Sequence, residues 1–311
     1  MVKKIKNYNN FNISKDHKNS IILIGNFDGV HAGHQKLFSQ AKKYKKKFKL
    51  KIGVITFEPM PKMYFNKKLN NFRISNLIQK KLLIQKLGVD FIITKKFDKN
   101  FSKIKYNSFI KDILHKKIKP KFIFVSNNFR FGNKREGNVR KLILCEKIFG
   151  YKIIKPKPLI FKNKIVSSTF IRKLLSKGNL NYANKLLRRN WSIQGSVQKG
   201  RQVGKKIGFP TCNLDIKNYV IPKLGVYAVK IRRKNTNKIL KGIANLGYRP
   251  TFNQKKILLE VFIFNFSSNL YNKVLIIDFI SFIRNEKKFK NIIQLKKQIS
   301  SDLVKAKKKL N

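Results

Sequence analysis

The stretch IILIGNFDGVHAGHQ (residues 21–35) constrains the fold of this chain more than any other part of the sequence. Its first four residues are apolar and mostly β-branched, which predicts a buried parallel strand. The glycines that follow allow a tight turn and a close approach of the backbone to a ligand. Apolar residues at helical spacing come next (Leu37, Phe38 and Ala41), so the strand is predicted to end in a loop that opens a helix. The free N–H groups and the positive dipole end of such a helix bind anions readily.

His31 and His34 lie in that loop with the spacing H-x-G-H. On a helix they could share one face as metal ligands, but no third histidine, cysteine or acidic ligand lies nearby at metal-binding spacing. Beside glycines at a helix N-terminus they are better suited to phosphate, because imidazoles donate hydrogen bonds to phosphate oxygens and the dipole stabilises developing charge. The alternative, two ordinary polar loop residues, is weaker because two of the chain's four histidines lie here.

The chain has 311 residues, which is enough for two domains with separate cores. A hydrophobic content of 42% with 26 phenylalanines excludes a disordered tail. The first twenty residues are polar, so we expect neither a secretory leader nor a membrane span. Cys145 and Cys212 are expected in different domains, which predicts no disulfide framework and a reducing cytoplasm as the setting.

The formal net charge of +60 raises the alternative of a basic RNA-binding module, because clustered Lys and Arg neutralise phosphates. Here the lysines are spread along the whole chain together with Ile, Asn and Phe. Such a uniform bias is typical of drift toward AT-rich codons rather than of a selected surface. We therefore expect no specific nucleic-acid partner, although the field attracts anionic nucleotides.

Strand and helix patterns alternate over the first half of the chain. Apolar runs predict strands at residues 52–57, 89–94, 122–125 and 152–154, and helical periodicity predicts helices at 77–87 and 109–115. This alternation predicts an open parallel α/β sheet, Rossmann-like, as the domain of residues 1–185. Ligands on such sheets bind beyond the carboxyl ends of the strands, where the histidine loop is expected to lie.

The string GNFDGVHAGHQ resembles the signature of nucleotidyltransferases of the HxGH type. Within them it is most similar to the bacterial bifunctional riboflavin kinase/FAD synthetases. Another HxGH transferase, making a coenzyme A or cytidylyl product, would explain this half of the chain alone. The resemblance implies catalytic roles for His31 and His34. It also implies nucleotide binding by the residues before them: Gly25, Phe27, Asp28 and Gly29.

Three further elements of the first half match this family. TFEPMP resembles its T-F-x-P-x-P element, with Met60 where histidine is common, and implies flavin contacts for Phe57 and Pro59. SNNFRFG resembles G-x-N-F-x-F-G and implies nucleotide binding by Asn128. SSTFIR resembles S-S-T-x-x-R and implies a second phosphate clamp, for which simple helix capping near Phe170 is the alternative. Its residues are Ser168, Thr169 and Arg172.

From residue 192 the pattern changes to strand-like runs of period two, separated by Gly, Asn and Pro. These runs predict a compact antiparallel β-barrel in the domain of residues 186–311. A basic segment of helical period, residues 287–310, is expected to pack on the barrel. Its apolar stripe consists of Ile292, Ile293, Leu295, Ile299, Leu303 and Val304.

Within the predicted barrel, KGRQVGKKIGFPTCNL resembles the flavokinase signature G-x-x-x-G-x-x-x-G-F-P-T-A-N. Its glycines allow backbone N–H groups to wrap around phosphates: Gly200, Gly204 and Gly208. Thr211 and Asn213 lie two apart, so on a strand they share one face. Their oxygens, completed by nucleotide phosphates and water, suit Mg²⁺. Taken alone, the PTxN string could equally be an ordinary turn.

Glu260 lies among apolar residues in a strand pattern, which would raise the pKa of its carboxyl group and suit a general base. The family's catalytic glutamate falls at this position, and Arg284 belongs to an R-N-E element that implies a structural or flavin-side role. Ile165 and Phe262 stand where arginine and histidine are frequent, so a chain with one decayed site is an open alternative.

The resemblance implies two reactions on one chain. The barrel would phosphorylate riboflavin with ATP to give FMN. The first domain would adenylylate FMN with a second ATP to give FAD, with Mg²⁺ as the metal. We therefore expect small-molecule partners and no membrane partner.

Overall fold

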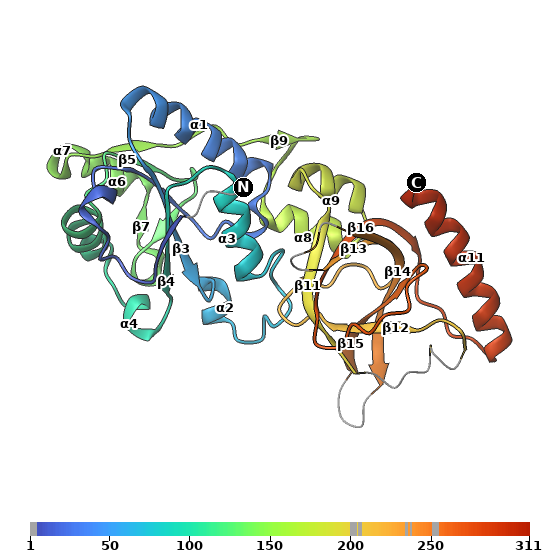
Figure 1. The fold of residues 1–311 in the computed structure, drawn as a ribbon. Helices are drawn as coiled ribbons and strands as arrows, with labels where there is room; N and C mark the ends of the chain where they lie inside the picture. The colour runs from blue at the N-terminus through green and yellow to red at the C-terminus, as the bar shows by residue number, and fades with distance from the viewer. Residues whose placement is uncertain (1–4, 200–203, 205–206, 234–235, 237, 251–254) are drawn as a thin grey trace. The chain divides into compact units, whose positions relative to one another are not determined.

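The computed structural model describes residues 5–199, 204, 207–233, 236, 238–250 and 255–311 (Figure 1). It separates into two compact units. The first comprises Met1–Leu69 with Leu77–Ser167, and the second comprises Asn70–Asn76 with Ser168–Asn311. The predicted classes, a parallel α/β domain followed by an antiparallel β-barrel, are confirmed. Residues 168–185 fold with the barrel, and the functional boundary at residue 185 stays a prediction.

The first unit is built on a parallel sheet with the strand order β1-β4-β3-β2-β5-β8. Its strands are β1 (Lys6–Tyr8), β2 (Ile21–Ile24), β3 (Ile52–Glu58), β4 (Phe91–Lys96), β5 (Phe122–Phe124) and β8 (Lys152–Ile154). Strand β1 was not expected from the polar first twenty residues. It is an edge strand with two exposed side chains, so it lacks the apolar run by which the buried strands are recognised.

Strand β2 is fully buried, and its side chains alternate between two cores. Ile21 and Leu23 pack on one face with residues of α1 and α3, while Ile22 and Ile24 pack on the other with residues of η3 and α6. The bounds are α1 (Ala32–Phe48), α3 (Leu77–Lys86), the π-helix η3 (Phe109–Ile118) and α6 (Val139–Leu144). This doubly covered sheet explains why β2 reads as a continuous apolar run.

Short elements complete the first unit. The 3-10 turns are η1 (Lys15–His17), η2 (Asp28–Val30) and η4 (Asn133–Arg135). The remaining helices are α2 (Pro61–Phe65), α4 (Lys99–Ser102), α5 (Tyr106–Ser108) and α7 (Glu146–Phe149). Two antiparallel pairs join β6 (Arg130–Phe131) to β7 (Gly137–Asn138) and β9 (Ile160–Phe161) to β10 (Lys164–Ile165).

The order of the sheet reverses between β2 and β5. Strands β3 and β4 follow β2 in one direction, whereas β5 and β8 lie on its other side. In open α/β sheets ligands bind at such a switch point, outside the carboxyl ends of the strands. The loops after β2, β3 and β5 meet at this edge because the three strands are parallel neighbours.

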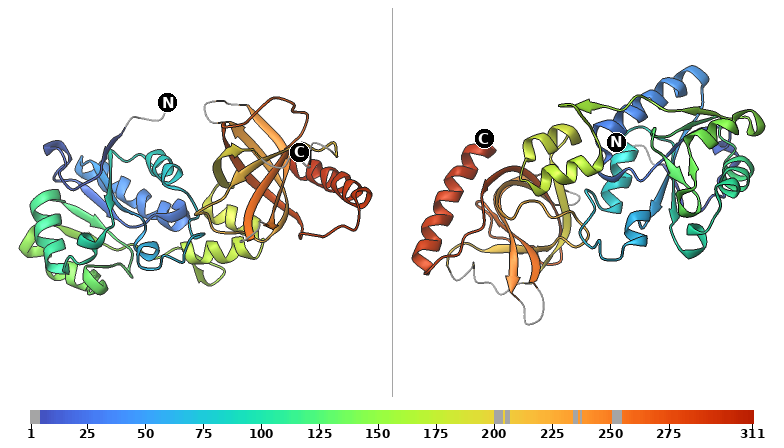
Figure 2. Two further views of the ribbon diagram at one scale, coloured as in Figure 1. Left: turned by 90° about the horizontal axis from the view of Figure 1, so that it is seen from below. Right: turned by 180° about the vertical axis from the view of Figure 1, so that it is seen from behind.

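The second unit is a closed antiparallel barrel (Figure 2). Its strand order is β11-β12-β15-β14-β13-β16. Its strands are β11 (Trp191–Gln198), β12 (Thr211–Asp215), β13 (Gly225–Arg233), β14 (Ile239–Pro250), β15 (Lys255–Ile263) and β16 (Val274–Arg284). Its helices are α8 (Ser168–Ser176), α9 (Leu180–Leu187) and α11 (Ile292–Leu310). Among the described residues, none of the helices combines the length and the apolar character that crossing a bilayer requires.

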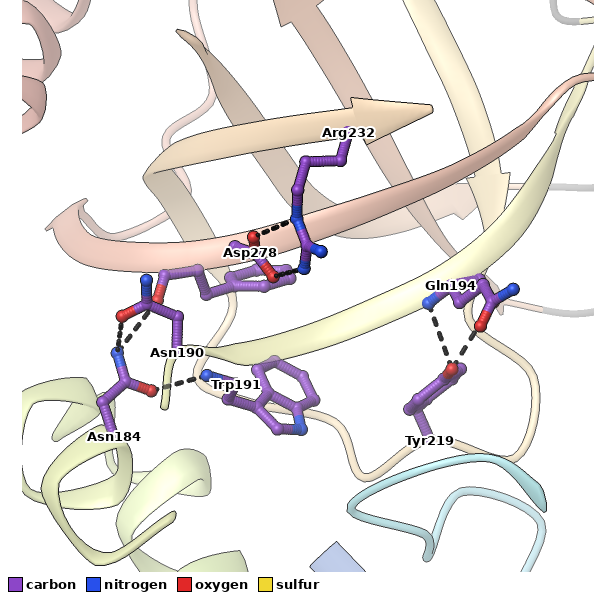
Figure 3. A network of polar contacts seen from close by, with 8 residues as sticks. Asn184, Asn190, Trp191, Gln194, Tyr219, Arg232 and Asp278 are labelled. Atoms are coloured by element: carbon purple, nitrogen blue, oxygen red, sulfur yellow. Dashed lines mark hydrogen bonds and ion pairs between the residues drawn. The ribbon is translucent and has the colours of Figure 1, made fainter. Parts of the chain in front are cut away.

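Polar contacts fasten α9 and residues 70–76 to the barrel, and those of Asn184 in α9 are drawn in Figure 3. The Asn184 side chain accepts a hydrogen bond from the Trp191 N–H at 2.7 Å and donates one to the Phe279 carbonyl at 3.0 Å. The indole N–H of Trp191 donates to the carbonyl of Ile74 at 2.8 Å. These bonds explain why α9 and residues 70–76 belong to the same compact unit as the barrel.

The terminal helix α11 packs on the barrel through a narrower stripe than the sequence pattern predicted. Ile299 and Leu303 pack against the barrel, and Ala306 and Leu310 are buried. Three of the predicted residues are exposed instead: Ile292, Ile293 and Val304. The contacting residues recur every three or four positions, so Val304, one position after Leu303, is turned about 100° away.

Candidate active sites

The histidine loop joins the carboxyl end of β2 to the first turn of α1. His31 is the N-cap residue of α1, and its Nδ1 accepts a hydrogen bond from the His34 N–H at 3.3 Å. The two imidazole rings stack, with centroids 3.7 Å apart and an interplanar angle of 20°. Because Nδ1 of His31 is an acceptor, the proton of its neutral imidazole lies on Nε2.

His34 is half-buried, and its Nδ1 lies in the interior without a hydrogen-bond partner. Its ring meets Phe27 edge-on, with centroids 5.2 Å apart. Burial lowers the pKa of His34 well below its usual range, and the neighbouring His31 lowers it further. His34 is therefore neutral near pH 7, with one ring nitrogen as donor and the other as acceptor.

The backbone before the histidines is strained. Phe27 is in the left-handed region with φ 49°, and Gly29 follows with φ 76° and Val30 with φ 39°. Non-glycine residues in this region are uncommon and gather at functional sites. At position 33 a glycine is favoured by close packing and not by its φ angle. A Cβ there would lie 3.0 Å from the Val166 carbonyl oxygen and 3.1 Å from Nδ1 of His31.

The other predicted nucleotide residues of this loop are also placed by tight packing. Asp28 is 3% exposed, in η2. The Gly25 N–H donates to the Ile55 carbonyl at 3.1 Å, and a Cβ on Gly25 would lie 3.2 Å from the Phe27 ring. The loop is therefore folded against the sheet rather than projecting freely from it.

The predicted residues after β3 and β5 lie at the same edge of the sheet as the histidine loop. Asn128 is exposed, and its Oδ1 accepts a hydrogen bond from the Ser126 hydroxyl at 3.0 Å. Phe57 at the end of β3 is mostly core, because its ring packs with Phe97 and Phe101. Pro59 follows in the next turn and is half-buried. Nucleotide binding by Asn128 and flavin contacts of Phe57 and Pro59 stay predictions.

Ser168, Thr169 and Arg172 belong to the second compact unit. Helix α8 begins at Ser168, two residues earlier than expected, so both hydroxyl residues lie in its first turn. The Arg172 Nε donates to the Phe72 carbonyl at 2.7 Å, and its guanidinium lies over the Phe72 ring at 3.6 Å. Arg172 thus holds the loop of residues 70–76, and the phosphate clamp stays a prediction.

In the barrel, strand register aligns a row of polar side chains. Asn213 of β12 pairs with Glu260 of β15, and Glu260 pairs with Asn245 of β14. Register partners in a sheet project to the same face, with Cβ atoms roughly 4.5–5.5 Å apart. Asn213 is 7% exposed, and its Oδ1 is buried without a partner. The predicted metal residue and the predicted general base are thus neighbours.

Asn245 is not among the site residues predicted from the sequence. It lies in the ANLGYRPTF string, where an isolated amide in an apolar strand was the available signal. Two positions along the same strands, Ile243 and Phe262 form the next pair on this face and pack in the cluster beneath α11. The row of Asn213, Glu260 and Asn245 therefore lies on the outer face of the barrel.

The glycine loop of the barrel closes beside Thr211, which is exposed. The Phe209 N–H donates to the Gly204 carbonyl at 2.8 Å. A Cβ on Gly204 would meet the Phe209 carbonyl oxygen at an impossibly short distance and the Thr211 hydroxyl at 3.3 Å. Gly208 has φ 91°, which favours glycine. Gly200 lies outside the described residues.

Arg284 forms an ion pair with the nearly inaccessible carboxylate of Asp302 in α11, at 2.8 Å. It also donates to the Asn285 carbonyl at 2.9 Å. These contacts give Arg284 a structural role in attaching α11, and its flavin contact stays a prediction.

Two family models match the chain, one for each half. The FAD synthetase model matches residues 13–170, and the riboflavin kinase model matches residues 187–310. The matched ranges contain the histidine loop and the polar row of the barrel, respectively.

Curated relatives match over nearly the whole length of the chain. The bifunctional riboflavin kinase/FMN adenylyltransferase of Buchnera aphidicola subsp. Schizaphis graminum is 41% identical over 96% of this chain and 97% of the relative. Relatives of the same name from Haemophilus influenzae and Escherichia coli K12 are 38% and 35% identical. They cover 92% and 91% of this chain and 92% and 90% of the relatives.

A solved structure also matches both units. It is titled as a macrolide-efflux protein from Streptococcus pneumoniae, is 27% identical and gives a TM-score of 0.86. The match covers 97% of this chain and 98% of that one. The activity named in that title is a statement about that protein and is not assigned to this chain.

Both family models and the curated relatives agree with one another, and the chain belongs to the family of bifunctional riboflavin kinase/FMN adenylyltransferases.

Proposed function

We propose which residues carry out the two reactions of this bifunctional transferase. The barrel unit phosphorylates riboflavin with ATP to give FMN and ADP, and the α/β unit adenylylates FMN with ATP to give FAD and pyrophosphate. The observation that carries the assignment is a pair of orphaned atoms. Among the described residues, four side-chain atoms are buried without partners, and two of them, Nδ1 of His34 and Oδ1 of Asn213, lie in motifs that match the family. Buried polar atoms normally have partners, so these two are available to a ligand.

In adenylyl transfer, a phosphate oxygen of FMN attacks the α-phosphorus of ATP, and the bond to the pyrophosphate oxygen breaks. His31 donates from Nε2 to the phosphate oxygens, and its Nδ1 bond to the α1 backbone fixes the direction of that donation. The N-terminus of α1 adds its dipole at the same point. Asn128 binds the nucleotide from the neighbouring loop.

The lowered pKa of His34 gives it a neutral role. A neutral imidazole keeps one N–H, and with it His34 stabilises the developing charge through a hydrogen bond. Adenylyl transfer needs no general base, because the attacking phosphate is already ionised. Positioning and electrostatic stabilisation therefore supply the catalysis. Ser168, Thr169 and Arg172, which match the family's S-S-T-x-x-R element, are proposed to bind phosphate.

In the kinase reaction, the Glu260 carboxylate accepts the proton of the riboflavin 5′-hydroxyl. The hydroxyl oxygen attacks the γ-phosphorus of ATP, and ADP leaves. Asn213 and Asn245 flank Glu260 in register on the same face of the barrel. Backbone N–H groups of the loop that contains Gly204 and Gly208 bind the phosphates.

The residues beside Glu260 fit Mg²⁺. The orphaned Oδ1 of Asn213 and the Thr211 hydroxyl are hard oxygen donors two positions apart on one strand, so they share a face. When bound, the ion would neutralise the charge of the nucleotide phosphates and leave its remaining positions to phosphate and water.

Small molecules are the partners that we propose: ATP, riboflavin and FMN, with no specific nucleic acid and no membrane. Cys145 and Cys212 are both free, and burial raises the pKa of the Cys212 thiol, which lowers its reactivity. Two free thiols fit a reducing cytoplasm as the setting.

The assignment is tested by chromatographic analysis of the products that the purified chain makes from riboflavin, ATP and Mg²⁺. We expect FMN first and FAD after it. FMN without FAD would contradict the α/β site, and FAD formed only from added FMN would contradict the barrel site. Neither product from a folded chain would overturn both.

A further inference from the structure

The buried polar side chains of the first unit, apart from Ser20 at the opposite end of β2, lie in the histidine loop or on the elements beside it. Among its described residues they are Ser20, Asp28, His31, Thr56 and Lys80. Asp28 and His31 are part of the loop itself, and Thr56 and Lys80 lie on the elements that support it. Lys80 is 2% exposed, and burying a lysine is costly unless its ammonium group is hydrogen-bonded.

A chain of two hydrogen bonds connects Lys80 to the loop. The Lys80 Nζ donates to the Thr56 hydroxyl at 3.1 Å, and that hydroxyl donates to the Asn26 carbonyl at 3.3 Å. A hydroxyl can accept and donate at once, and an ammonium donor polarises it and so strengthens its own donation. Asn26 directly precedes Phe27, where the left-handed turn begins.

The three residues come from three different elements. Thr56 lies on β3, Lys80 lies on α3, and Asn26 lies in the loop between β2 and η2. Helix α3 packs against η2 within this loop. Ile84, one turn after Lys80, shares a core cluster with Phe27 and Val30. The helix therefore approaches the loop with an apolar contact and a polar one.

We propose that Lys80 is a positioning residue for adenylyl transfer. Acting through Thr56, it holds the Asn26 carbonyl and thereby the strained turn that presents His31 and His34 to the phosphates. Lys80 is itself too deeply buried to contact substrate. This inference rests on the proposed role of the histidine loop, because it assigns a support to that loop.

The main test compares Lys80→Met with Lys86→Met, which removes an exposed lysine from the same helix. We expect Lys80→Met to lower kcat for FMN adenylylation roughly 10- to 100-fold, because small misplacements of positioned groups have effects of this size. The KM values for FMN and ATP should change little, and Lys86→Met should match the parent. Riboflavin kinase activity of the same molecules measures the folded barrel and should not change.

A second comparison uses two threonines that are register partners on neighbouring strands, Thr56 and Thr94. The Thr94 hydroxyl is buried without a partner, so Thr94→Val removes a similar group without breaking a bond. Thr56→Val removes both bonds of the chain, so it should lower kcat at least as much as Lys80→Met, roughly 10- to 100-fold, and Thr94→Val should not. Combining Lys80→Met with Thr56→Val should lower kcat no further than Thr56→Val alone, because both act through one chain of bonds.

Equal kcat values for Lys80→Met and Lys86→Met would overturn the inference. Equal losses in Thr56→Val and Thr94→Val would also overturn it, and this comparison stands if Lys80→Met fails to fold. His31→Asn in the same assay distinguishes a failure of the Lys80 support from a failure of the proposed role of the loop. If His31→Asn loses activity and the Lys80 and Thr56 variants do not, only this inference fails. If none of them loses activity, the proposed role of the loop fails too.

Discussion

The two active sites of this chain are held in position by different means. In the α/β unit the proposed catalytic groups lie on a loop, whose conformation depends on strained residues such as Phe27 and on buried polar support from Thr56. In the barrel, Asn213 and Glu260 lie on paired strands, and the backbone register alone places them side by side. A site on a loop thus needs supporting contacts, whereas a site on paired strands obtains its geometry from the backbone hydrogen bonds between those strands.

This difference has a consequence for sensitivity to mutation. Changes behind the histidine loop should affect catalysis at a distance, because the loop has no regular hydrogen-bond ladder of its own. Changes near Glu260 should matter chiefly where they alter a side chain on the outer face. The following predictions test this contrast, beginning with the largest expected effect.

Glu260→Gln should lower the riboflavin kinase rate roughly 10²- to 10⁴-fold, the usual contribution of a general base. Gln keeps the size and the polar character of the side chain, so the barrel should remain folded. The rate of FAD formation from added FMN should not change, and both rates are measured on the same sample by separating the flavins. Retention of kinase activity would show that another group accepts the proton.

His31→Asn should lower FMN adenylylation roughly 10²- to 10³-fold, since it removes the Nε2 donor to the phosphates. Asparagine is itself a favoured N-cap residue, so helix α1 keeps its cap. The kinase rate provides the control. A variant with normal adenylylation would show that the cap, and not the donor, is what this position requires.

Asn213→Ala should raise the Mg²⁺ concentration for half-maximal kinase activity by roughly tenfold, the size of one lost polar interaction. Cys212→Ala is the matched control, because the neighbouring side chain projects to the opposite face of β12. A magnesium titration of the kinase rate measures both. Equal shifts in the two variants would argue against a metal role for Asn213.

The smallest effect concerns pH and stability. The folded-state pKa of His34 is lowered, so below about pH 6.5 the unfolded chain binds a proton that the folded chain does not. The free energy of unfolding should therefore fall as the pH falls, by up to about 1.4 kcal/mol per pH unit until the folded pKa is reached. Burial lowers the pKa of His17 as well, so the test is the difference between the parent and His34→Gln in urea unfolding. Equal slopes in the two proteins would contradict the assignment.

Much of this architecture could be predicted because its signals are local. An apolar run, glycines and a helical period together fix the β2–loop–α1 unit around His31. The alternation of side chains in β12 likewise predicts that Thr211 and Asn213 share a face. Each of these features depends on residues that are close together in the sequence.

Other features depend on long-range packing, and the sequence does not reveal them. Burial of Lys80 could not be recognised in a chain with 73 Lys and Arg, where one lysine resembles another. The pairing of Asn245 with Glu260 depends on strand register, and the exposure of Val304 depends on how α11 sits on the barrel. The polar lead-in likewise gave no sign that Lys6–Tyr8 pairs with β4.

The most direct test of two independent sites is complementation between the two inactivated chains. Glu260→Gln alone should make no FAD from riboflavin, and His31→Asn alone should stop at FMN. A mixture of the two variants with riboflavin, ATP and Mg²⁺ should form FAD, because FMN released by one chain is a substrate for the other. If the mixture forms FMN but no FAD while both variants are folded, and Glu260→Gln alone also fails to convert added FMN, then the account of two separate sites is wrong.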